Sequence, residues 1–268
     1  MNRAPTDAEP VGARFIAPTT DIPPTTDIPP TTDIVPTTDI VPTTDIGLLA
    51  ALQLGDSLFP SGGFTLSHGL ETLAERGLVT DAASLQAWLA TTVCWQVAPS
   101  DGVAAATVWS AGDDLDSIAE IDRYLLATKL AREPREASLR TGRQMLSTLA
   151  TLAGGTLLQY HQRVSTESAT GLQPVVLGIA GRQLGLGRRE TVLLLLHLHL
   201  SGCLGAALRL TDVDDVEAQR IRFAMATVMS DAADEALAVP WKKMYACAVQ
   251  SELMTMIHER ATMRLFAS

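Results

Sequence analysis

Apolar residues recur at the three- and four-residue spacing of an α-helix along most of the chain. Leu66, Leu70 and Leu73 would share one face of the first clear stretch of this kind. Gly77 follows that stretch, and Gly at this point is typical of a helix C-terminus. The same pattern predicts helices over residues 47–55, 64–76, 81–97, 101–111, 113–129, 134–152, 157–166, 171–185 and 192–210, one that starts within 212–217 and a last one after Pro240.

The composition supports a fold made only of helices. Hydrophobic residues are 47% of the chain and aromatic residues only 4%. Ala and Leu dominate the hydrophobic positions, which favours helices packed on helices. We therefore predict an all-α protein with a single globular helical-bundle domain of about ten helices over residues 47–268.

The N-terminal residues 1–46 differ from the rest. From residue 19 the sequence Thr-Thr-Asp-Ile occurs five times at a six-residue period, with Pro in every spacer. Regular Pro disfavours helices and central strands, and one Ile per repeat buries too little surface to offset the entropy lost on ordering. We predict a disordered tail over residues 1–46, which is either a partner-binding arm or a simple repeat of variable length.

Charge and cysteine content narrow the class of protein. The formal net charge is -10 at pH 7, which argues against a nucleic-acid-binding protein, because such a protein carries a basic stripe. Cys94, Cys203 and Cys247 lie far apart without metal-ligand spacing, which suits a reducing, cytoplasmic compartment. The apolar run 192–208 is short for a bilayer span and contains two histidines. We predict that it is a buried core helix and that the protein does not bind membranes.

No stretch predicts a metal or nucleotide site. His197 and His199 are two positions apart, so on a helix they would point about 200° apart and could not bind one ion together. The chain also lacks the patterns of phosphate-binding loops, zinc proteases and serine hydrolases. We predict no catalytic residues, no metal and no cofactor on this chain, and we expect that it is not an enzyme.

The most informative stretch is residues 59–71, Phe-Pro-Ser-Gly-Gly-Phe-Thr-Leu-Ser-His-Gly-Leu-Glu. Its proline and its pair of glycines predict a rigid turn that leads into a helix. That helix would bury its leucines and place His68, Glu71 and Glu75 on the outward face. An ordinary glycine turn before an amphipathic helix also explains the Pro, Gly and Leu, but it does not explain Ser67, His68 and Glu71 together.

A second polar pattern opens the predicted helix 134–152 with the sequence Arg-Glu-Pro-Arg-Glu-Ala-Ser-Leu-Arg-Thr-Gly from residue 132. Pro134 suits the first turn of a helix. Ser138 and Gly142 are small and would allow close approach of a neighbouring helix, with the basic side chains opposite. A basic helix face is usually just solvated, so this pattern alone is weak.

Both patterns resemble urease accessory proteins of the UreF type. Residues 60–71 fit the UreF signature Pro-x-Gly-Gly-[Phe/Tyr]-x-x-Ser-x-Gly-Leu-Glu, and Arg-Glu-x-Arg-x-x-Ser-x-x-x-Gly is similar to a second UreF pattern. The resemblance runs in order over roughly residues 47–266. Gln173 departs from it, because UreF-type chains commonly have His or another ring residue before this Pro-Val pair. A metal or hydrogen-bonding role is therefore not carried over to position 173.

The resemblance implies a non-catalytic, homodimeric urease maturation factor, a chaperone-like accessory protein. It would scaffold UreD (UreH in some organisms) and the GTPase UreG for nickel insertion into apo-urease, with nickel and GTP held by the partners. The Met-rich residues 241–268 would pack on the core or bind a partner, with partner binding favoured past Arg260. The partner-binding residues implied by the two patterns are Pro60, Gly62, Gly63, Phe64, Ser67, His68, Gly69, Glu71, Arg132, Glu133, Arg135, Ser138 and Gly142.

An alternative from another class is an all-helical enzyme with a buried acid/base pocket around His68 and Glu71. Such enzymes place single catalytic residues inside a helical core, so missing linear motifs are only modest evidence against them. Turnover of a small molecule by the chain alone would favour this alternative. Co-purification with UreD and UreG would favour the scaffold.

Overall fold

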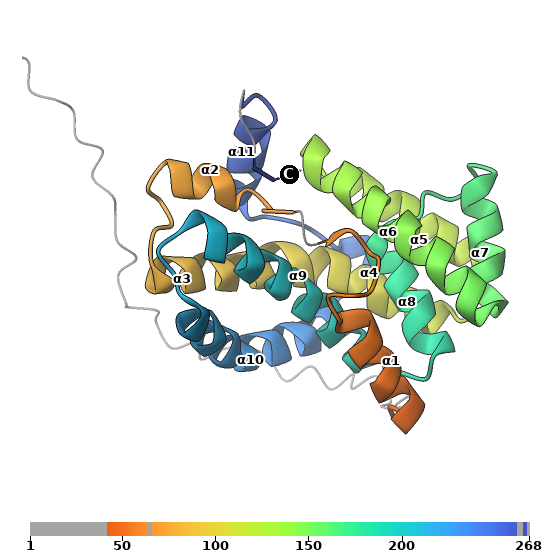
Figure 1. Ribbon diagram of the computed structural model, residues 1–268. Helices are drawn as coiled ribbons and strands as arrows, with labels where there is room; N and C mark the ends of the chain where they lie inside the picture. Colours follow the sequence, from red (N-terminus) through yellow and green to blue (C-terminus); the bar gives the residue numbers. More distant parts are fainter. Residues whose placement is uncertain (1–41, 64–65, 262–264, 267–268) are drawn as a thin grey trace, which may run out of the picture. The chain divides into compact units, whose positions relative to one another are not determined.

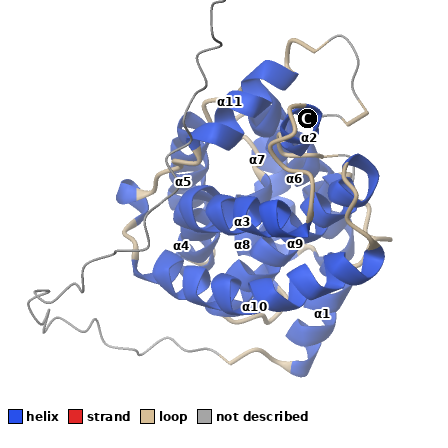
Figure 2. Ribbon diagram, turned by 90° about the vertical axis from the view of Figure 1, so that its left-hand side faces the viewer, coloured by secondary structure: helices blue, strands red, loops and turns tan. Residues whose placement is uncertain are grey.

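The computed structural model describes residues 42–63, 66–261 and 265–266. These described residues form α-helices, one π-helical segment and one 3-10 turn, and none of them lies in a strand (Figure 1). Figure 2 shows the same composition of helices and loops from a second direction. The all-α prediction is confirmed. The predicted tail falls outside the described residues except for residues 42–46.

The described helices follow one another in chain order (Figure 1). Their bounds are α1 Asp45–Gly55, α2 Leu70–Glu75, α3 Ala82–Thr92, the π-helical segment Val93–Gly102, α4 Val103–Ala111, α5 Leu115–Thr128, α6 Arg132–Ala153, α7 Gly155–Ser165, α8 Gln173–Gln183, α9 Arg188–Leu210, α10 Asp215–Ala238, the 3-10 turn Trp241–Lys243 and α11 Val249–His258.

Local capping residues set several of these helix ends. Asp81 accepts a hydrogen bond from the amide of Ser84 in a capping box that starts α3, and Asp114 caps α5 in a similar way. Gly77 has a left-handed conformation, and the amide after it bonds back to the carbonyl of Leu73, which ends α2. These predicted helix starts and the predicted stop at Gly77 are confirmed.

The chain stays helical through Pro99, so the prediction of two separate helices over residues 81–97 and 101–111 is wrong. α3, the π-helical segment and α4 follow one another without a gap from Ala82 to Ala111, and Pro99 lies inside the π-helical segment. Proline has no amide hydrogen to donate, and in an α-helix its ring clashes with the carbonyl four residues earlier. The wider turn of a π-helix carries the chain past this position.

The core lies between the π-helical segment, α4, α8, α9 and α10. α4 packs chiefly on α8, the π-helical segment packs chiefly on α10, and α9 contacts both α8 and α10. By length and composition α9 could cross a membrane, but 61% of its most apolar stretch is buried against the other helices. The prediction of a core helix over residues 192–208 is confirmed.

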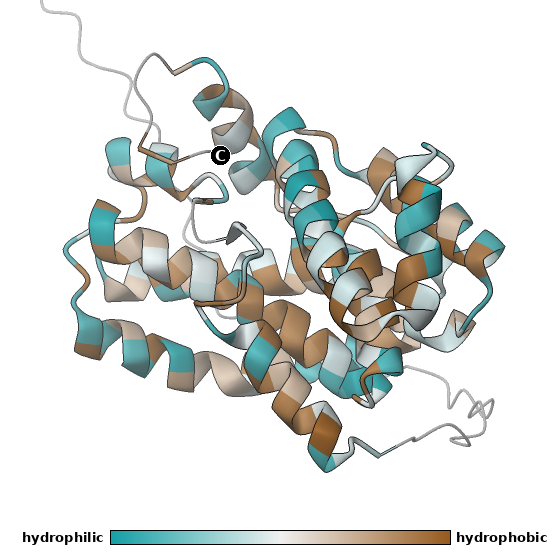
Figure 3. Cartoon of the chain, turned by 45° about the vertical axis from the view of Figure 1, so that its right-hand side comes forward, coloured by the Kyte–Doolittle hydropathy of each residue, from teal (hydrophilic) through white to brown (hydrophobic). Residues whose placement is uncertain are grey.

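α1 differs from its predicted start, and it is largely exposed. It begins at Asp45, within the predicted tail, because Thr44 caps it by accepting a hydrogen bond of 2.9 Å from the amide of Gly47. It is also not a buried helix. Only Gly47 and Leu54 are buried, and most of its apolar side chains are exposed. Figure 3 colours much of this helix brown, the colour of hydrophobic residues. The exposed ones are Ile46, Leu48, Leu49 and Leu52.

Candidate partner-binding site

The signature stretch turns its polar groups inward. His68 and Gly69 both have left-handed backbones, with φ of 54° and 87°, and α2 begins only at Leu70. This shift changes which side chains face the core. Ser67 and Glu71 are buried and His68 is partly buried, so the prediction that His68 and Glu71 point outward is wrong. The leucines of this stretch are buried and Glu75 is exposed, as predicted.

Glu71 is buried because its carboxylate meets partners from the C-terminal end of the chain. Its Oε2 lies 3.0 Å from Nε2 of His258 on α11. Its two oxygens also accept hydrogen bonds from the amides of Leu265 at 2.7 Å and Phe266 at 3.1 Å. A buried carboxylate is stable only when its acceptor positions are filled in this way.

His258 connects the two signature patterns. Its Nδ1 lies 2.8 Å from Oε2 of Glu133, the second residue of α6, while its Nε2 contacts Glu71. The three side chains are 1%, 3% and 5% exposed for His258, Glu71 and Glu133, so water does not replace these contacts. The first pattern, the second pattern and the last helix therefore share one buried polar joint.

Further contacts from the C-terminal helix strengthen this joint. Oε1 of Glu259 accepts hydrogen bonds from the amides of Arg132 at 2.8 Å and Glu133 at 3.3 Å, at the start of α6. Acceptors at a helix N-terminus satisfy amides that have no partner within the helix. Near the N-terminal end of α11, Nε1 of Trp88 donates to Oγ of Ser251 at 2.8 Å.

α11 buries polar side chains and exposes apolar ones, which is the reverse of the usual arrangement in a surface helix. Its buried residues are Ser251, Thr255 and His258, all polar. Most of its apolar side chains point away from the body. Exposed fractions are 60% for Val249, 51% for Leu253, and 37% each for Met256 and Ile257. The helix therefore presents an apolar row to its surroundings. We call these four residues the α11 outer face.

A cavity of about 110 Å³ lies where the two patterns meet. Gly63 and His68 of the first pattern and Ser138 of the second line it, and so do Gln173 at the start of α8 and His199 on α9. Within the described part of the chain, Oγ of Ser138 is buried without a hydrogen-bond partner. Glu71 does not line this cavity.

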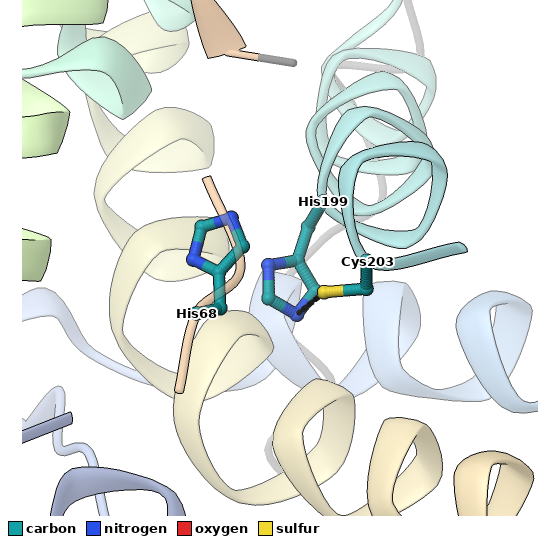
Figure 4. Close-up of side chains that lie close together, drawn as sticks. All are labelled: His68, His199 and Cys203. Atoms are coloured by element: carbon teal, nitrogen blue, oxygen red, sulfur yellow. Dashed lines mark hydrogen bonds between the residues drawn. The ribbon is translucent and has the colours of Figure 1, made fainter. Parts of the chain in front are cut away.

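Two neutral histidines and a thiol lie together beside the cavity. The ring centroids of His68 and His199 are 4.7 Å apart, and Sγ of Cys203 lies 3.7 Å from Nε2 of His199 (Figure 4). Burial lowers the pKa of His68 to about 3, with smaller effects from His199 and Lys129, and lowers the pKa of His199 to about 4. Burial also raises the pKa of the Cys203 thiol.

The other residues of the two patterns divide between surface and interior. Pro60, Gly62 and Arg132 are exposed, Gly63 and Arg135 are partly buried, and Gly69 and Gly142 are buried, while Phe64 lies outside the described residues. Gly142 touches the backbone of Gly171, leaving no room for a side chain. The predicted close approach at Gly142 is confirmed.

Sequence reasoning missed His258, Glu259 and Cys203. His258 and Glu259 contact residues more than a hundred positions away, and no local spacing marks such partners. His199 and Cys203 did carry a signal, because they are four positions apart and share one face of α9.

The sequence is similar to those of known urease accessory proteins. A family model described as UreF matches residues 79–226. A protein named urease accessory protein UreF from Actinobacillus pleuropneumoniae serotype 5b is 29% identical over 222 residues, which cover 82% of this chain and 98% of the relative. Urease accessory protein UreF 2 of Brucella canis is 30% identical over 223 residues, which cover 82% of this chain and 91% of the relative.

Proposed function

Because the chain belongs to the UreF family of urease accessory proteins, we propose that it is a non-catalytic scaffold that binds UreD/UreH and the GTPase UreG for nickel insertion into apo-urease. The observation that carries the proposal is the reversed polarity of α11. The glutamates of both signature patterns hold this helix in place, and its apolar side faces outward. In this proposal the partner proteins, and not this chain, hold the nickel and the GTP.

The α11 outer face has the chemistry of a protein interface. Leu253, Met256 and Ile257 lie within two turns of one helix. Fully burying one such side chain contributes roughly 1.5–3 kcal/mol. Methionine adapts to irregular partner surfaces. Arg132, exposed beside Glu259, adds a charged group at the rim of this face.

A scaffold of this kind acts through differential binding. A protein without nucleotide chemistry can shift a GTPase between states only if it binds one state more tightly, with typical couplings of about 1–3 kcal/mol. A rigidly positioned apolar helix suits this task, because pre-ordering lowers the entropy cost of association. The buried joint of Glu71, His258 and Glu133 provides that rigidity.

The alternative of an enzyme with an acid/base pair at His68 and Glu71 is less favoured. The two side chains do not share a pocket, since His68 lines the cavity and Glu71 does not. Both oxygens of Glu71 are engaged by His258 and by amides of the C-terminal segment. A general base needs an oxygen within reach of a substrate proton.

We also propose that the protein works in the cytoplasm as a homodimer. The exposed row Ile46, Leu48, Leu49 and Leu52 on α1 offers a second apolar surface that a copy of the chain would cover. Light scattering of the purified chain should give twice the mass of one chain. Leu49→Lys together with Leu52→Lys should return the monomer mass if α1 forms the dimer contact.

Co-purification tests the scaffold. The chain should bind UreD/UreH and UreG homologues, and urease activation should depend on its presence. Leu253→Lys and Ile257→Lys should abolish complex formation while leaving the circular dichroism spectrum unchanged. Leu152→Lys is the matched control, because Leu152 is 66% exposed at the far end of α6. Full activation by the Leu253→Lys, Ile257→Lys double variant would refute the role of the α11 outer face.

A further inference from the structure

Three side chains that can bind metals meet in the interior of the protein. His68 comes from the turn before α2, and His199 and Cys203 come from α9. One ligand atom from each lies within 4.8 Å of the other two. The ring of His199 lies between the other two side chains (Figure 4).

The distances are close to those of a metal site. A tetrahedral zinc site with bonds of about 2.0–2.3 Å places its ligand atoms roughly 3.3–3.6 Å apart. The pair of His199 Nε2 and Cys203 Sγ is already at 3.7 Å. The remaining separations of up to 4.8 Å need only a shift of about 1 Å, which side-chain rotation can provide.

Binding requires particular protonation states of the three ligands. Metal ions bind the neutral form of imidazole and the thiolate form of cysteine. The Cys203 thiol has to lose its proton on binding, a step that a metal cation drives. Nζ of Lys129, a nearby positive charge, lies 2.7 Å from a carboxylate oxygen of Asp101. This ion pair reduces the repulsion between Lys129 and a bound metal ion.

The surroundings also favour a ligand rather than simple packing. His68 has a left-handed backbone, a conformation that non-glycine residues rarely adopt and that is often found at functional sites. His68 and His199 line the 110 Å³ cavity, which leaves room for a further ligand. Glu252 also lines this cavity.

We propose that His68, His199 and Cys203 form a binding site for a divalent transition-metal ion of the type that prefers imidazole and thiolate ligands, with a further coordination position open to the cavity. Zn²⁺ and Co²⁺ belong to this class, and Mg²⁺ and Ca²⁺, which prefer oxygen ligands, do not. The site lies inside one chain and needs no partner protein.

A Co²⁺ titration of the untagged, reduced, metal-free full chain tests the proposal. We expect one Co²⁺ per chain, with the visible bands of tetrahedral Co²⁺ and a thiolate-to-Co²⁺ charge-transfer band in the near ultraviolet. One equivalent of Zn²⁺ should remove both signals, and Mg²⁺ should not. Absence of the charge-transfer band in the unmodified chain would overturn the proposal.

Variants locate the ligands. Cys203→Ser should abolish the charge-transfer band, and His68→Gln and His199→Gln should each weaken Co²⁺ binding at least about tenfold, since loss of a mere outer partner of a ligand costs about 10–100-fold. The controls Cys247→Ser and His197→Gln should bind like the unmodified chain. Cys247 is exposed, and His197 is outside the cluster.

Each variant is checked for folding by circular dichroism before titration. His68 lies in a turn rather than a helix, so His68→Gln keeps the test decisive if a variant of α9 does not fold. Equal Co²⁺ affinity in Cys203→Ser, or loss of the band in Cys247→Ser, would contradict this assignment. The readout involves neither urease nor a partner, so its outcome is independent of the proposed scaffold function.

Discussion

Oε2 of Glu71 lies 3.0 Å from Nε2 of His258. This contact joins residues 59–71, near the start of the described sequence, directly to α11, the last helix. Nδ1 of the same ring reaches Glu133 at 2.8 Å. One imidazole therefore fixes the relative positions of α2, α6 and α11.

Glu71→Ala should release the C-terminal segment. The substitution leaves His258 and the amides of Leu265 and Phe266 without their acceptor, and each buried polar group left unsatisfied costs about 1–3 kcal/mol. We expect much faster hydrogen exchange at both amides and faster trypsin cleavage after Arg260. Glu75→Ala on the exposed side of α2 is the control. Unchanged exchange in Glu71→Ala would show that other contacts hold the segment.

Gly69→Ala should destabilise the protein more than Gly62→Ala. Both glycines have left-handed backbones, which cost an alanine about 1–2 kcal/mol. At Gly69 the added Cβ would also lie 2.8 Å from Oγ1 of Thr255, whereas at Gly62 nothing lies within 4 Å. Urea denaturation measures the difference in the free energy of unfolding. Equal losses would mean that α11 moves aside without cost.

Tyr160→Phe should lower the free energy of unfolding by about 1.5–3 kcal/mol, the usual value for a hydrogen bond to a charged group. The hydroxyl of Tyr160 donates to the buried carboxylate of Asp122 at 2.6 Å, and that carboxylate also accepts hydrogen bonds from the amides of Thr170 and Gly171, just before α8. Tyr124→Phe is the matched control, because Tyr124 is 37% exposed and donates to a backbone carbonyl. Chemical denaturation of both variants decides the prediction.

The three thiols should differ widely in reactivity. Cys247 is exposed, whereas burial raises the pKa of Cys94 and raises that of Cys203 strongly. Because the thiolate is the reactive form, iodoacetamide should modify Cys247 first, then Cys94, and Cys203 only after unfolding. Mass spectrometry of tryptic peptides gives the order. Early modification of Cys203 would show that the region around α9 opens readily.

The helices could be predicted from the sequence because their signals are local. Asp81, Asp114 and Gly77 act on residues within one turn of themselves, so their effect can be seen in a short stretch. Pro99 gave the wrong prediction because a proline excludes only the α-helical path, and the π-helical path keeps the chain helical.

The candidate site was predicted less well because its geometry depends on distant residues. Glu71 reads as an outward charge until His258 is known to face it, and nothing near His258 in the sequence indicates that it does. The inward direction of His68 follows from its left-handed backbone, which moves the helix start to Leu70. Glu71 and Glu133 of the two patterns hold α11 in place through His258, while the role of the two patterns in partner binding stays a prediction.

The reversed polarity of α11 has a consequence for how the domain comes apart. Segments held by hydrocarbon contacts expose oily surface when they detach, and this ties their loss to collapse of the core. Ser251, Thr255 and His258 are instead readily hydrated once they leave the body. Because these three residues carry little apolar surface, detachment of α11 would expose less of it than detachment of a helix with a buried apolar row.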